Sequence, residues 1–228
     1  MTRKLYDLCS ASPTVRFSRP CWLAKFALLH KQLEFDTVPL RFTEKENYPD
    51  PEYGLLPVLD DDGEIVRDSA EIIAYLDKKY PENPFFNSEG ERAAADFVNA
   101  FLGAHLFSAL APFMFIRVHK VLAPEDQVYF RETREKRFGV TLEALAADEA
   151  LPGKITAALT TLGAPLQKHD FFGGEKPNMI DYQVASPLMW KRSITTEELY
   201  ETPDTVAAWF ERILDLYDGY CRKAASAG

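Results

Sequence analysis

Strand-like and helix-like stretches are divided unevenly along this 228-residue chain, and that division most constrains its fold. Over about the first 80 residues, short stretches typical of strands are interleaved with stretches whose apolar residues recur at helical spacing. From Glu89 onward only the helical spacing remains. The segment in between, Pro81–Ser88, has the composition of a linker. We therefore expect an α/β domain over residues 1–82 and an all-helical domain over residues 88–228.

The first domain is expected to follow the order β-α-β-(α)-β-β-α. A hairpin is indicated by the run Asp60-Asp61-Asp62-Gly63, because an Asp-Gly pair between two strands is typical of a tight turn. The polar segment Thr43–Pro51 is expected to be irregular or weakly helical. The remaining expected elements are the strands Lys4–Leu8, Phe35–Leu40, Leu56–Leu59 and Glu64–Arg67 and the helices Pro20–Lys31 and Ser69–Tyr80.

The second domain is expected to hold about five helices. Glu125–Ala147 is expected to form one long, highly charged helix. Further helices are expected around Phe97–Ala109 and over Lys154–Lys168, Asn178–Lys191 and Pro203–Ala224.

Composition excludes several classes of protein. With 46% hydrophobic and 27% charged residues, the chain has the mix of an ordinary globular protein. No uninterrupted apolar run approaches the ~18 residues of a membrane span, and Met1–Asp7 lacks the apolar region of a secretory signal. The formal net charge of −9 argues against a nucleic-acid partner. The three cysteines lack zinc spacing and suit reduced thiols, so we expect a cytoplasmic protein with no membrane or nucleic-acid partner.

One cluster of cations needs separate mention. Its members alternate with Glu132 and Glu135, which is typical of a solvated helix face and not of a nucleic-acid patch. They are Arg131, Arg134, Lys136 and Arg137.

The first candidate site segment is Ser18-Arg19-Pro20-Cys21, between the first expected strand and helix. Thioredoxin-like folds carry Cys-x-x-Cys at this junction, where the helix N-terminus lowers a thiol pKa. Ser18 occupies the position of the nucleophilic cysteine here, and a serine there can donate a hydrogen bond to the thiolate of a bound molecule. Simple capping of the helix by Ser18 is the competing interpretation.

The second candidate segment is Leu56-Pro57, just before an expected strand. A cis peptide at this point turns the N–H and C=O of Leu56 outward, where they can pair with an extended peptide. An ordinary trans proline at the start of a strand is the alternative.

The third candidate segment is Asp68-Ser69, at the start of a helix. The free N–H groups there form an anion site that suits an α-carboxylate, and Asp68 can receive an ammonium group. Asp68 and Glu71 also have the spacing of a capping box, which would make the pair purely structural.

Together the three segments describe a site for a short peptide with a thiol and a free α-amino acid end. Glutathione fits this description, and no metal is needed. His105 and His119 lie roughly four helical turns apart, too far to share a metal ion.

The order and spacing of several motifs resemble the cytosolic glutathione transferase superfamily over essentially the whole chain. Leu56-Pro57-Val58-Leu59, Asp68-Ser69 and Asp77-Lys78-Lys79-Tyr80-Pro81 are similar to its N-terminal domain, and Asn178-Met179-Ile180-Asp181 is similar to the motif that caps a buried helix of its C-terminal domain. The resemblance implies a thioredoxin-like domain followed by an all-helical bundle.

The segment from Ser18 to Lys31 and the segment Trp209–Gly219 resemble the serine-type branch that includes bacterial β-aryl etherases and related fungal transferases. The resemblance implies a detoxification-type, homodimeric glutathione S-transferase. Ser18 would assist the thiolate, and glutathione would be held by Leu56, Pro57, Asp68 and Ser69. Its glycyl carboxylate could meet Arg41 or Lys45, and the co-substrate would be an apolar, aromatic electrophile such as an aryl ether.

Alternatives remain at this stage. Tyr6, Ser10 and Ser12 are substitutes for Ser18 if the loop is arranged differently. The protein could instead be a non-catalytic glutathione-binding or regulatory protein, or a glutathione-dependent thiol–disulfide reductase or dehalogenase, although the last two want a cysteine in place of Ser18. The electrophile pocket could be walled by Phe101, His105, Leu106, Phe113 and Phe115, or this stripe could be core packing.

Overall fold

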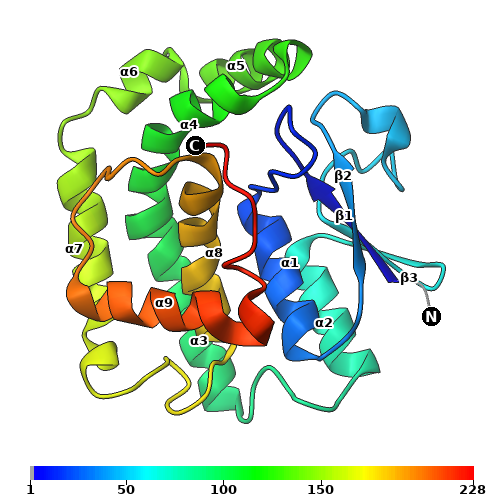
Figure 1. Cartoon of the computed structure of the whole chain (residues 1–228), viewed down its shortest axis with the longest axis vertical. Helices are drawn as coiled ribbons and strands as arrows, with labels where there is room; N and C mark the ends of the chain where they lie inside the picture. The colour runs from blue at the N-terminus through cyan, green and yellow to red at the C-terminus, as the bar shows by residue number, and fades with distance from the viewer. Residues whose placement is uncertain (1–2) are drawn as a thin grey trace.

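A small mixed β-sheet with two helices lies beside a larger set of helices in the computed structural model, which describes residues 3–228 (Figure 1). The strand order is β2-β1-β3-β4, with β2 parallel to β1 and with β3 and β4 added antiparallel. This is the α/β-plus-helical architecture and the element order that the sequence predicts. The strands are β1 (Arg3–Leu8), β2 (Asp36–Leu40), β3 (Val58–Asp61) and β4 (Glu64–Arg67).

The hairpin differs from the prediction by two residues, because β3 covers Val58–Asp61 and not Leu56–Leu59. Asp62 and Gly63 have φ values of 61° and 95°, which fits the two-residue turn that an Asp-Gly pair forms. The Leu56–Pro57 peptide, just before the strand, is cis as expected. The sequence pattern places the strand too early because aspartate is a poor strand former. The strand nevertheless includes Asp60 and Asp61, and Asp61 is buried among polar partners.

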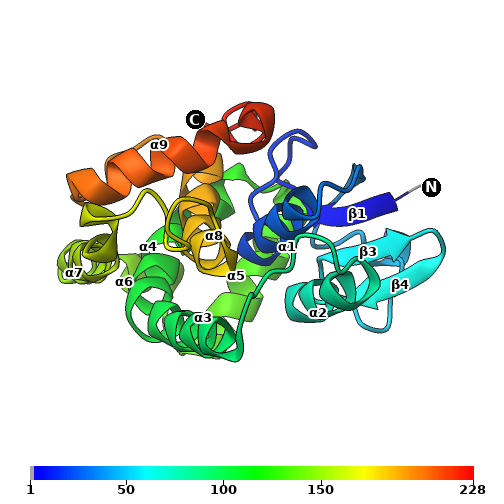
Figure 2. The ribbon, with the colours of Figure 1, turned by 90° about the horizontal axis from the view of Figure 1, so that it is seen from below.

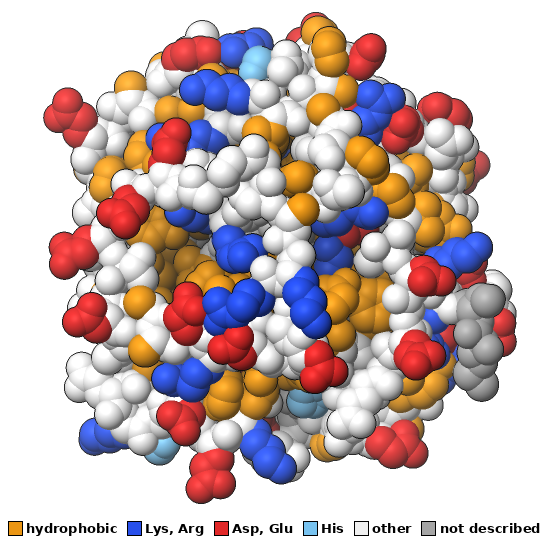
Figure 3. Space-filling model, viewed as in Figure 1, with side chains coloured by type: hydrophobic (Ala, Val, Ile, Leu, Met, Phe, Trp, Pro, Cys, Tyr) orange, Lys and Arg blue, Asp and Glu red, His pale blue; other side chains and the backbone are white. Residues whose placement is uncertain are grey.

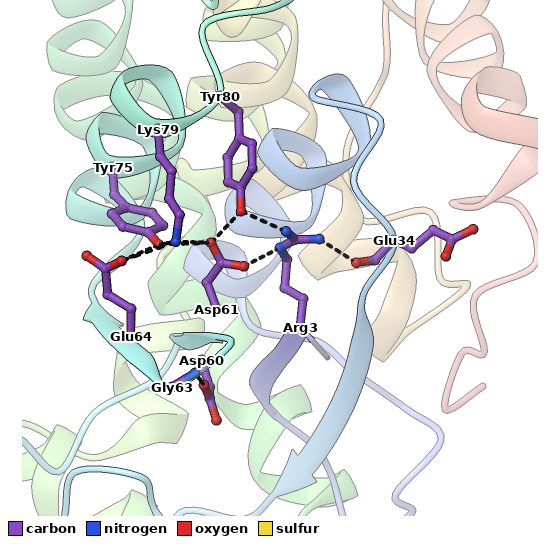
Figure 4. Close-up of polar contacts among 9 residues, drawn as sticks. All are labelled: Arg3, Glu34, Asp60, Asp61, Gly63, Glu64, Tyr75, Lys79 and Tyr80. Carbon is purple, nitrogen blue, oxygen red and sulfur yellow. Dashed lines mark hydrogen bonds and ion pairs between the residues drawn. The ribbon is translucent and has the colours of Figure 1, made fainter. Parts of the chain in front are cut away.

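The carboxylate of Asp61 gathers donors from several elements (Figure 4). It accepts hydrogen bonds from Arg3 Nε at 2.9 Å, the Tyr80 hydroxyl at 2.7 Å and the Tyr75 hydroxyl at 2.8 Å, and Lys79 Nζ lies 3.1 Å away. Burial raises the pKa of Asp61, but these hydrogen bonds outweigh it and leave the pKa below its usual value. The cluster fastens the C-terminal end of helix α2 (Ser69–Lys79) to the sheet and so orients its N-terminal end.

Helix α1 (Arg19–His30) packs between the sheet and the helical domain (Figure 2). Lys25 Nζ lies 2.5 Å from the carboxylate of Asp7 in β1, and both side chains are buried. On the other side, the ring of Phe26 stacks on Tyr182 with centroids 5.3 Å apart. The helix is therefore fixed to both domains.

The helical domain begins at α3 (Glu89–Phe101), which runs through a π-helical segment, Leu102–Phe107, into α4 (Ser108–Val121). The prediction of one helix over Glu125–Ala147 is wrong. Gly139, with φ 74°, ends the first part, and Thr141 caps a second, short helix. The remaining helices are α5 (Pro124–Phe138), α6 (Leu142–Ala146), α7 (Leu151–Gly163), α8 (Met179–Ile194) and α9 (Asp204–Gly219), with 3-10 turns at Lys45–Asn47 and Pro165–Gln167.

The continuous helical stretch Glu89–Val121 is long and apolar enough to cross a membrane by length and composition, with a mean hydropathy of 1.6 over 18 residues. The sequence expectation overlooked it because it counted only uninterrupted apolar residues, whereas here uncharged polar residues break the run. Leu106, Leu110 and Met114 on this stretch are fully buried in the domain core. In this structure 39% of the residues in that apolar window are buried.

The start of α8 depends on Asp181, which is fully buried. Its carboxylate accepts hydrogen bonds from the backbone N–H groups of Phe172, Gly173 and Asn178 and from the indole Nε1 of Trp209, at 2.8–3.2 Å. Asn178 completes the capping box by accepting from the N–H of Ile180 at 2.9 Å, which confirms the predicted N-capping motif. Burial raises the pKa of Asp181, and the four donors oppose that rise.

Asp181→Ala should lower the free energy of unfolding by at least about 3 kcal/mol, because each buried donor left without an acceptor costs about 1–3 kcal/mol. Urea unfolding followed by circular dichroism measures the change. Asp96→Ala, at an exposed acid on α3, is the control and should stay within about 0.5 kcal/mol of the parent protein. Equal stabilities of the two variants would contradict the role given to Asp181.

Candidate functional site

A cavity of about 260 Å³ lies between the two domains. On one side it is bounded by the start of α1 and by the segments that follow β2 and precede β3; on the other by α4, α5 and α8. Helix α5 is held against the segment after β2, as Figure 1 shows, because the N–H of Thr43 donates to Asp126 at 2.9 Å. The lining residues of the first side include Leu8, Ser18, Arg19, Phe42, Lys45, Tyr48, Gly54 and Leu56, and those of the second are Phe107, Phe115, Val118, Tyr129, Phe130, Arg134 and Trp190.

Ser18 occupies the N-cap position of α1, and it lines this cavity. Its carbonyl accepts the N–H of Trp22 at 2.9 Å, but its hydroxyl makes no capping hydrogen bond. The interpretation of Ser18 as a side-chain cap is therefore not observed. The hydroxyl is largely buried at the positive end of a helix dipole, within hydrogen-bonding reach of the Cys21 thiol.

Leu56 meets Ser18 at the same cavity, and Pro57 lies buried behind it. The hairpin register pairs Val58 with Arg67, so the residue pair before β3 lies at the same end of the sheet as Asp68. Two of the three segments that the sequence singles out thus contribute to the cavity wall, and the third lies at the same end of the sheet as the Leu56-Pro57 segment.

Asp68 is the N-cap of α2 and accepts the N–H of Ala70 at 2.8 Å. The reciprocal half of a capping box, from Glu71, is not formed among the described contacts. Asp68 has φ 58° and ψ 146°, a conformation that costs a non-glycine residue about 1–3 kcal/mol and that concentrates at ligand sites. Ser69 is half-buried, and Asp68 is exposed.

The two cations considered for the glycyl carboxylate lie in different environments. Arg41 is bound to Glu44, through Nε at 3.0 Å, and lies 3.7 Å from Glu125. The hydrogen bond that Arg41 donates to Glu44 raises the pKa of Arg41. Lys45 lines the cavity, with Nζ 5.4 Å from the centre of the Tyr129 ring. Of Arg41 and Lys45, Lys45 is thus the cation that lines the cavity.

The substitutes for Ser18 lie elsewhere. Tyr6 is within β1, paired with Val38 and Val58, and Ser10 is buried and hydrogen-bonded to Ser12. None of Tyr6, Ser10 and Ser12 lines the cavity.

Core packing is the preferred interpretation of the stripe from Phe101 to Phe115, and it holds for Leu106, which is fully buried. Of the five residues considered for the electrophile wall, Phe115 alone lines the cavity, whereas Phe101 and His105 face a separate surface hollow beside α7. The cavity wall instead uses Phe107, Trp190, Tyr129 and Phe130, which come from three helices. No sequence spacing joins them, so only the packing of α4, α5 and α8 could identify the set.

Arg134 lines the cavity, which the sequence does not predict. Its charge pattern predicts a solvated helix face, but its guanidinium lies 4.4 Å from the centre of the Phe130 ring. Burial lowers the pKa of Arg134. Its spacing of four residues from Phe130, about one helical turn, is the signal that could have placed it on the apolar side of α5.

Comparison with known families gives this geometry a context. The model described as "Glutathione S-transferase, N-terminal domain" matches residues 13–84, and the model described as "Glutathione S-transferase, C-terminal domain" matches residues 93–218. The second match alone covers more than half of the chain. This chain belongs to the glutathione S-transferase family. The family and fold that the sequence motifs predict are thereby confirmed.

Individual relatives of this glutathione S-transferase family member are distant. A curated zeta-class glutathione S-transferase of Euphorbia esula is 29% identical over 100 residues, and that match spans 41% of this chain and 41% of the relative. A solved glutathione transferase of Phanerochaete chrysosporium is 25% identical with a TM-score of 0.75, covering 96% of this chain and 92% of that one.

Two further solved structures share the fold. One is a glutathione S-transferase of Ceriporiopsis subvermispora solved in complex with glutathione, with 24% identity, a TM-score of 0.73, and coverage of 98% of this chain and 95% of that one. The other is a β-etherase of Sphingobium sp. strain SYK-6, with 18% identity, a TM-score of 0.63, and coverage of 94% and 96%.

The cysteines of this transferase-family chain are all buried and unbonded. Burial raises the pKa of Cys9 to about 11 and that of Cys221 to about 12, and it raises the pKa of Cys21 further. A raised pKa keeps each sulfur protonated, which is the opposite of what a nucleophilic cysteine needs. This chain therefore offers no activated thiol of its own.

The native protein should accordingly react slowly with an aromatic disulfide reagent at pH 8. A thiol with a pKa near 11 is about one thousandth thiolate at that pH, and burial blocks access further. The measurement is the release of the coloured thiolate over time, which should count three thiols only after addition of guanidinium chloride. A thiol that reacts in the native protein as fast as free cysteine would contradict this.

Proposed function

We propose that this protein binds glutathione in the cavity between its domains, lowers the pKa of the glutathione thiol, and transfers the sulfur to an aromatic electrophile. The observation that carries the proposal is the Ser18 hydroxyl, which lines the same cavity as Leu56 and the aromatic wall and makes no capping bond. A hydroxyl that can donate a hydrogen bond to the glutathione thiolate, a backbone edge and an apolar pocket thus share one cavity.

Glutathione fits along the mouth of the cavity in one direction. The N–H and C=O of Leu56 pair with its cysteinyl residue, as a strand would. The γ-glutamyl end reaches the start of α2, where Asp68 receives the ammonium and the first N–H groups and Ser69 receive the carboxylate. The glycyl carboxylate meets Lys45, whose position on the cavity wall favours it over Arg41, already bound to Glu44.

Activation requires the pKa of the glutathione thiol to fall by about two units. A free thiol near 8.5 must fall to about 6.5 to be mostly thiolate at neutral pH, which corresponds to about 2.7 kcal/mol. A hydrogen bond to a charged sulfur contributes about 1.5–3 kcal/mol, and a helix N-terminus contributes up to about 2 kcal/mol. Ser18 and the start of α1 together can stabilise the thiolate by the required amount. The thiolate then attacks the electrophilic carbon, a C–S bond forms, and the leaving group departs with the bonding electrons.

An aryl ether is our first choice of electrophile, supported by the aromatic wall and by the shared fold of a β-etherase. Attack by the thiolate at the ether carbon would break the C–O bond and release a phenolate.

We place the protein in the cytoplasm as a homodimer with a role in detoxification. Phe97, an apolar side chain 72% exposed on α3, is one place where a second copy could cover the surface. On the face seen in Figure 3, acidic and basic side chains lie intermixed, which suits a protein without a nucleic-acid partner.

A non-catalytic glutathione-binding protein is the competing function. It would keep the residues that hold the peptide but would not need a hydroxyl beside the sulfur. Isothermal titration with glutathione tests binding, and the Ser18 variant below separates binding from activation.

Ser18→Ala should raise the pKa of bound glutathione by about one to two units, because the lost hydrogen bond is worth about 1.5–3 kcal/mol and each unit is 1.36 kcal/mol. Thiolate absorbance against pH, at saturating glutathione, measures it. The stabilisation acts above the depressed pKa, so the loss is largest near neutral pH and shrinks toward the pKa of the free thiol. Affinity should fall less than turnover.

Ser12→Ala is the matched control, since Ser12 is exposed in the same loop and does not line the cavity. It should leave the titration unchanged. An unchanged titration in Ser18→Ala as well would mean that this hydroxyl does not stabilise the thiolate.

Ser69→Ala should weaken glutathione binding several-fold, because a charge-assisted hydrogen bond of about 1.5–3 kcal/mol is lost at the γ-glutamyl carboxylate. The dissociation constant from isothermal titration is the readout. Ser88→Ala removes a serine at the start of another helix, α3, where Ser88 caps the N–H of Glu91. If both variants bind as the parent protein does, the γ-glutamyl end lies elsewhere.

A further inference from the structure

The charge of the cavity is opposite to that of the protein. The chain carries a formal net charge of −9, yet the cavity lining holds three cations, Arg19, Lys45 and Arg134. Neither aspartate nor glutamate belongs to that lining. A site built for an uncharged apolar molecule would not need this excess of positive charge.

None of these three cations, Lys45 included, has a counter-ion among the described residues. Within residues 3–228, no carboxylate comes within 4.0 Å of the guanidinium of Arg19 or of Arg134, whereas Arg131, one turn from Arg134 on α5, is bound to both Glu135 and Glu143. Burial lowers the pKa of both Arg19 and Arg134, and no charged partner offsets it for Arg19. A half-buried cation without a partner is costly, and a ligand anion would remove that cost.

The two guanidinium groups stand at the ends of a series of aromatic rings in contact. Arg19 lies 4.7 Å from the centre of Phe107, and Arg134 lies 4.4 Å from that of Phe130. Between them, ring centroids are 5.6 Å apart for Phe107 and Trp190, 6.3 Å for Trp190 and Phe115, and 5.9 Å for Phe115 and Phe130. This surface suits a flat ring that carries an acidic group.

We propose that the electrophile this cavity selects is an aromatic acid, whose ring lies on the Phe107–Trp190–Phe115–Phe130 wall and whose carboxylate is held by the guanidinium of Arg134. Arg134 is preferred to Arg19 because Arg19 follows Ser18 and lies at the glutathione end of the wall. Lys45 remains for the glycyl carboxylate. The planar fork of a guanidinium matches a carboxylate in a two-point contact, which a neutral ring cannot use. This inference rests on the proposed transferase function and adds a substrate class to it.

A pair of electrophiles that differ by one carboxylate tests the proposal. They are 1-chloro-2,6-dinitrobenzene and 4-chloro-3,5-dinitrobenzoate. In each the glutathione thiolate attacks the ring carbon that bears chlorine, a C–S bond forms, and chloride leaves with the bonding pair. The quantity measured is the ratio of kcat/KM for the acid to kcat/KM for the neutral compound, after correction for the uncatalysed rates.

We expect the parent protein to favour the acid, and Arg134→Gln to lower the ratio by about tenfold, the effect of one charge-assisted contact. Arg134→Lys should keep part of the preference, because it retains the charge without the fork. Arg137→Gln, which removes an exposed cation from the same helix, should leave the ratio as it is. A parent protein without preference for the acid, or an Arg134→Gln variant with the parent ratio, would overturn the proposal.

Binding measurements keep the two proposals apart. If neither chloride compound is turned over, the transferase function fails, and the charge preference is decided by isothermal titration with 3,5-dinitrobenzoate and 1,3-dinitrobenzene, which have no leaving group. Tighter binding of the acid that Arg134→Gln abolishes and Arg137→Gln preserves supports the anion site. Equal binding of the two compounds contradicts it.

Discussion

The packing of α1 between the sheet and α8 is the contact on which the site depends. The helix is apolar almost all round, and Cys21, Ala24, Phe26 and Leu28 are fully buried. Phe26 stacks on Tyr182 of α8, and the Tyr182 hydroxyl lies 2.8 Å from His30 Nδ1. A helix held on both faces cannot shift along its axis without breaking contacts in both domains. Its first residue, and the Ser18 hydroxyl before it, are therefore fixed relative to the helices that supply the aromatic wall.

The site combines unpaired cations with an unusual backbone conformation. Two buried carboxylates elsewhere are paired with cations, Asp7 with Lys25 and Asp61 with Arg3. In the cavity Arg19 and Arg134 lie half-buried against aromatic rings with no carboxylate within 4.0 Å among the described residues, and Asp68 at the start of α2 adopts a positive φ. Such departures cost folding free energy, and they concentrate where a ligand later satisfies them. Glutathione and an anionic co-substrate together supply the negative groups that these positions lack.

More of the structure of the α/β domain than of the helical domain could be predicted from the sequence. The element order, the cis peptide at Pro57 and the placement of Ser18 at the start of a helix follow from local chemistry, namely turn, proline and capping preferences. The electrophile wall does not, because Phe107, Phe130 and Trp190 come from different helices and meet only through tertiary packing. Arg134 was misjudged for the same reason, since charge alternation along α5 says nothing about which side faces the other domain. Gly139 gave a local signal for the break after α5, but the amphipathic pattern on either side of it masked that signal.

The central claim is that one cavity holds the glutathione sulfur beside Ser18 and the electrophile on the aromatic wall. A crystal structure with S-benzylglutathione tests it most directly, since the thioether joins both halves in one molecule. The account predicts the sulfur within contact distance of the Ser18 hydroxyl, the peptide backbone paired with Leu56, and the benzyl ring against Phe107, Phe115 and Trp190. A ligand bound with its sulfur facing Tyr6, or with its benzyl ring in solvent away from α4, α5 and α8, would contradict it.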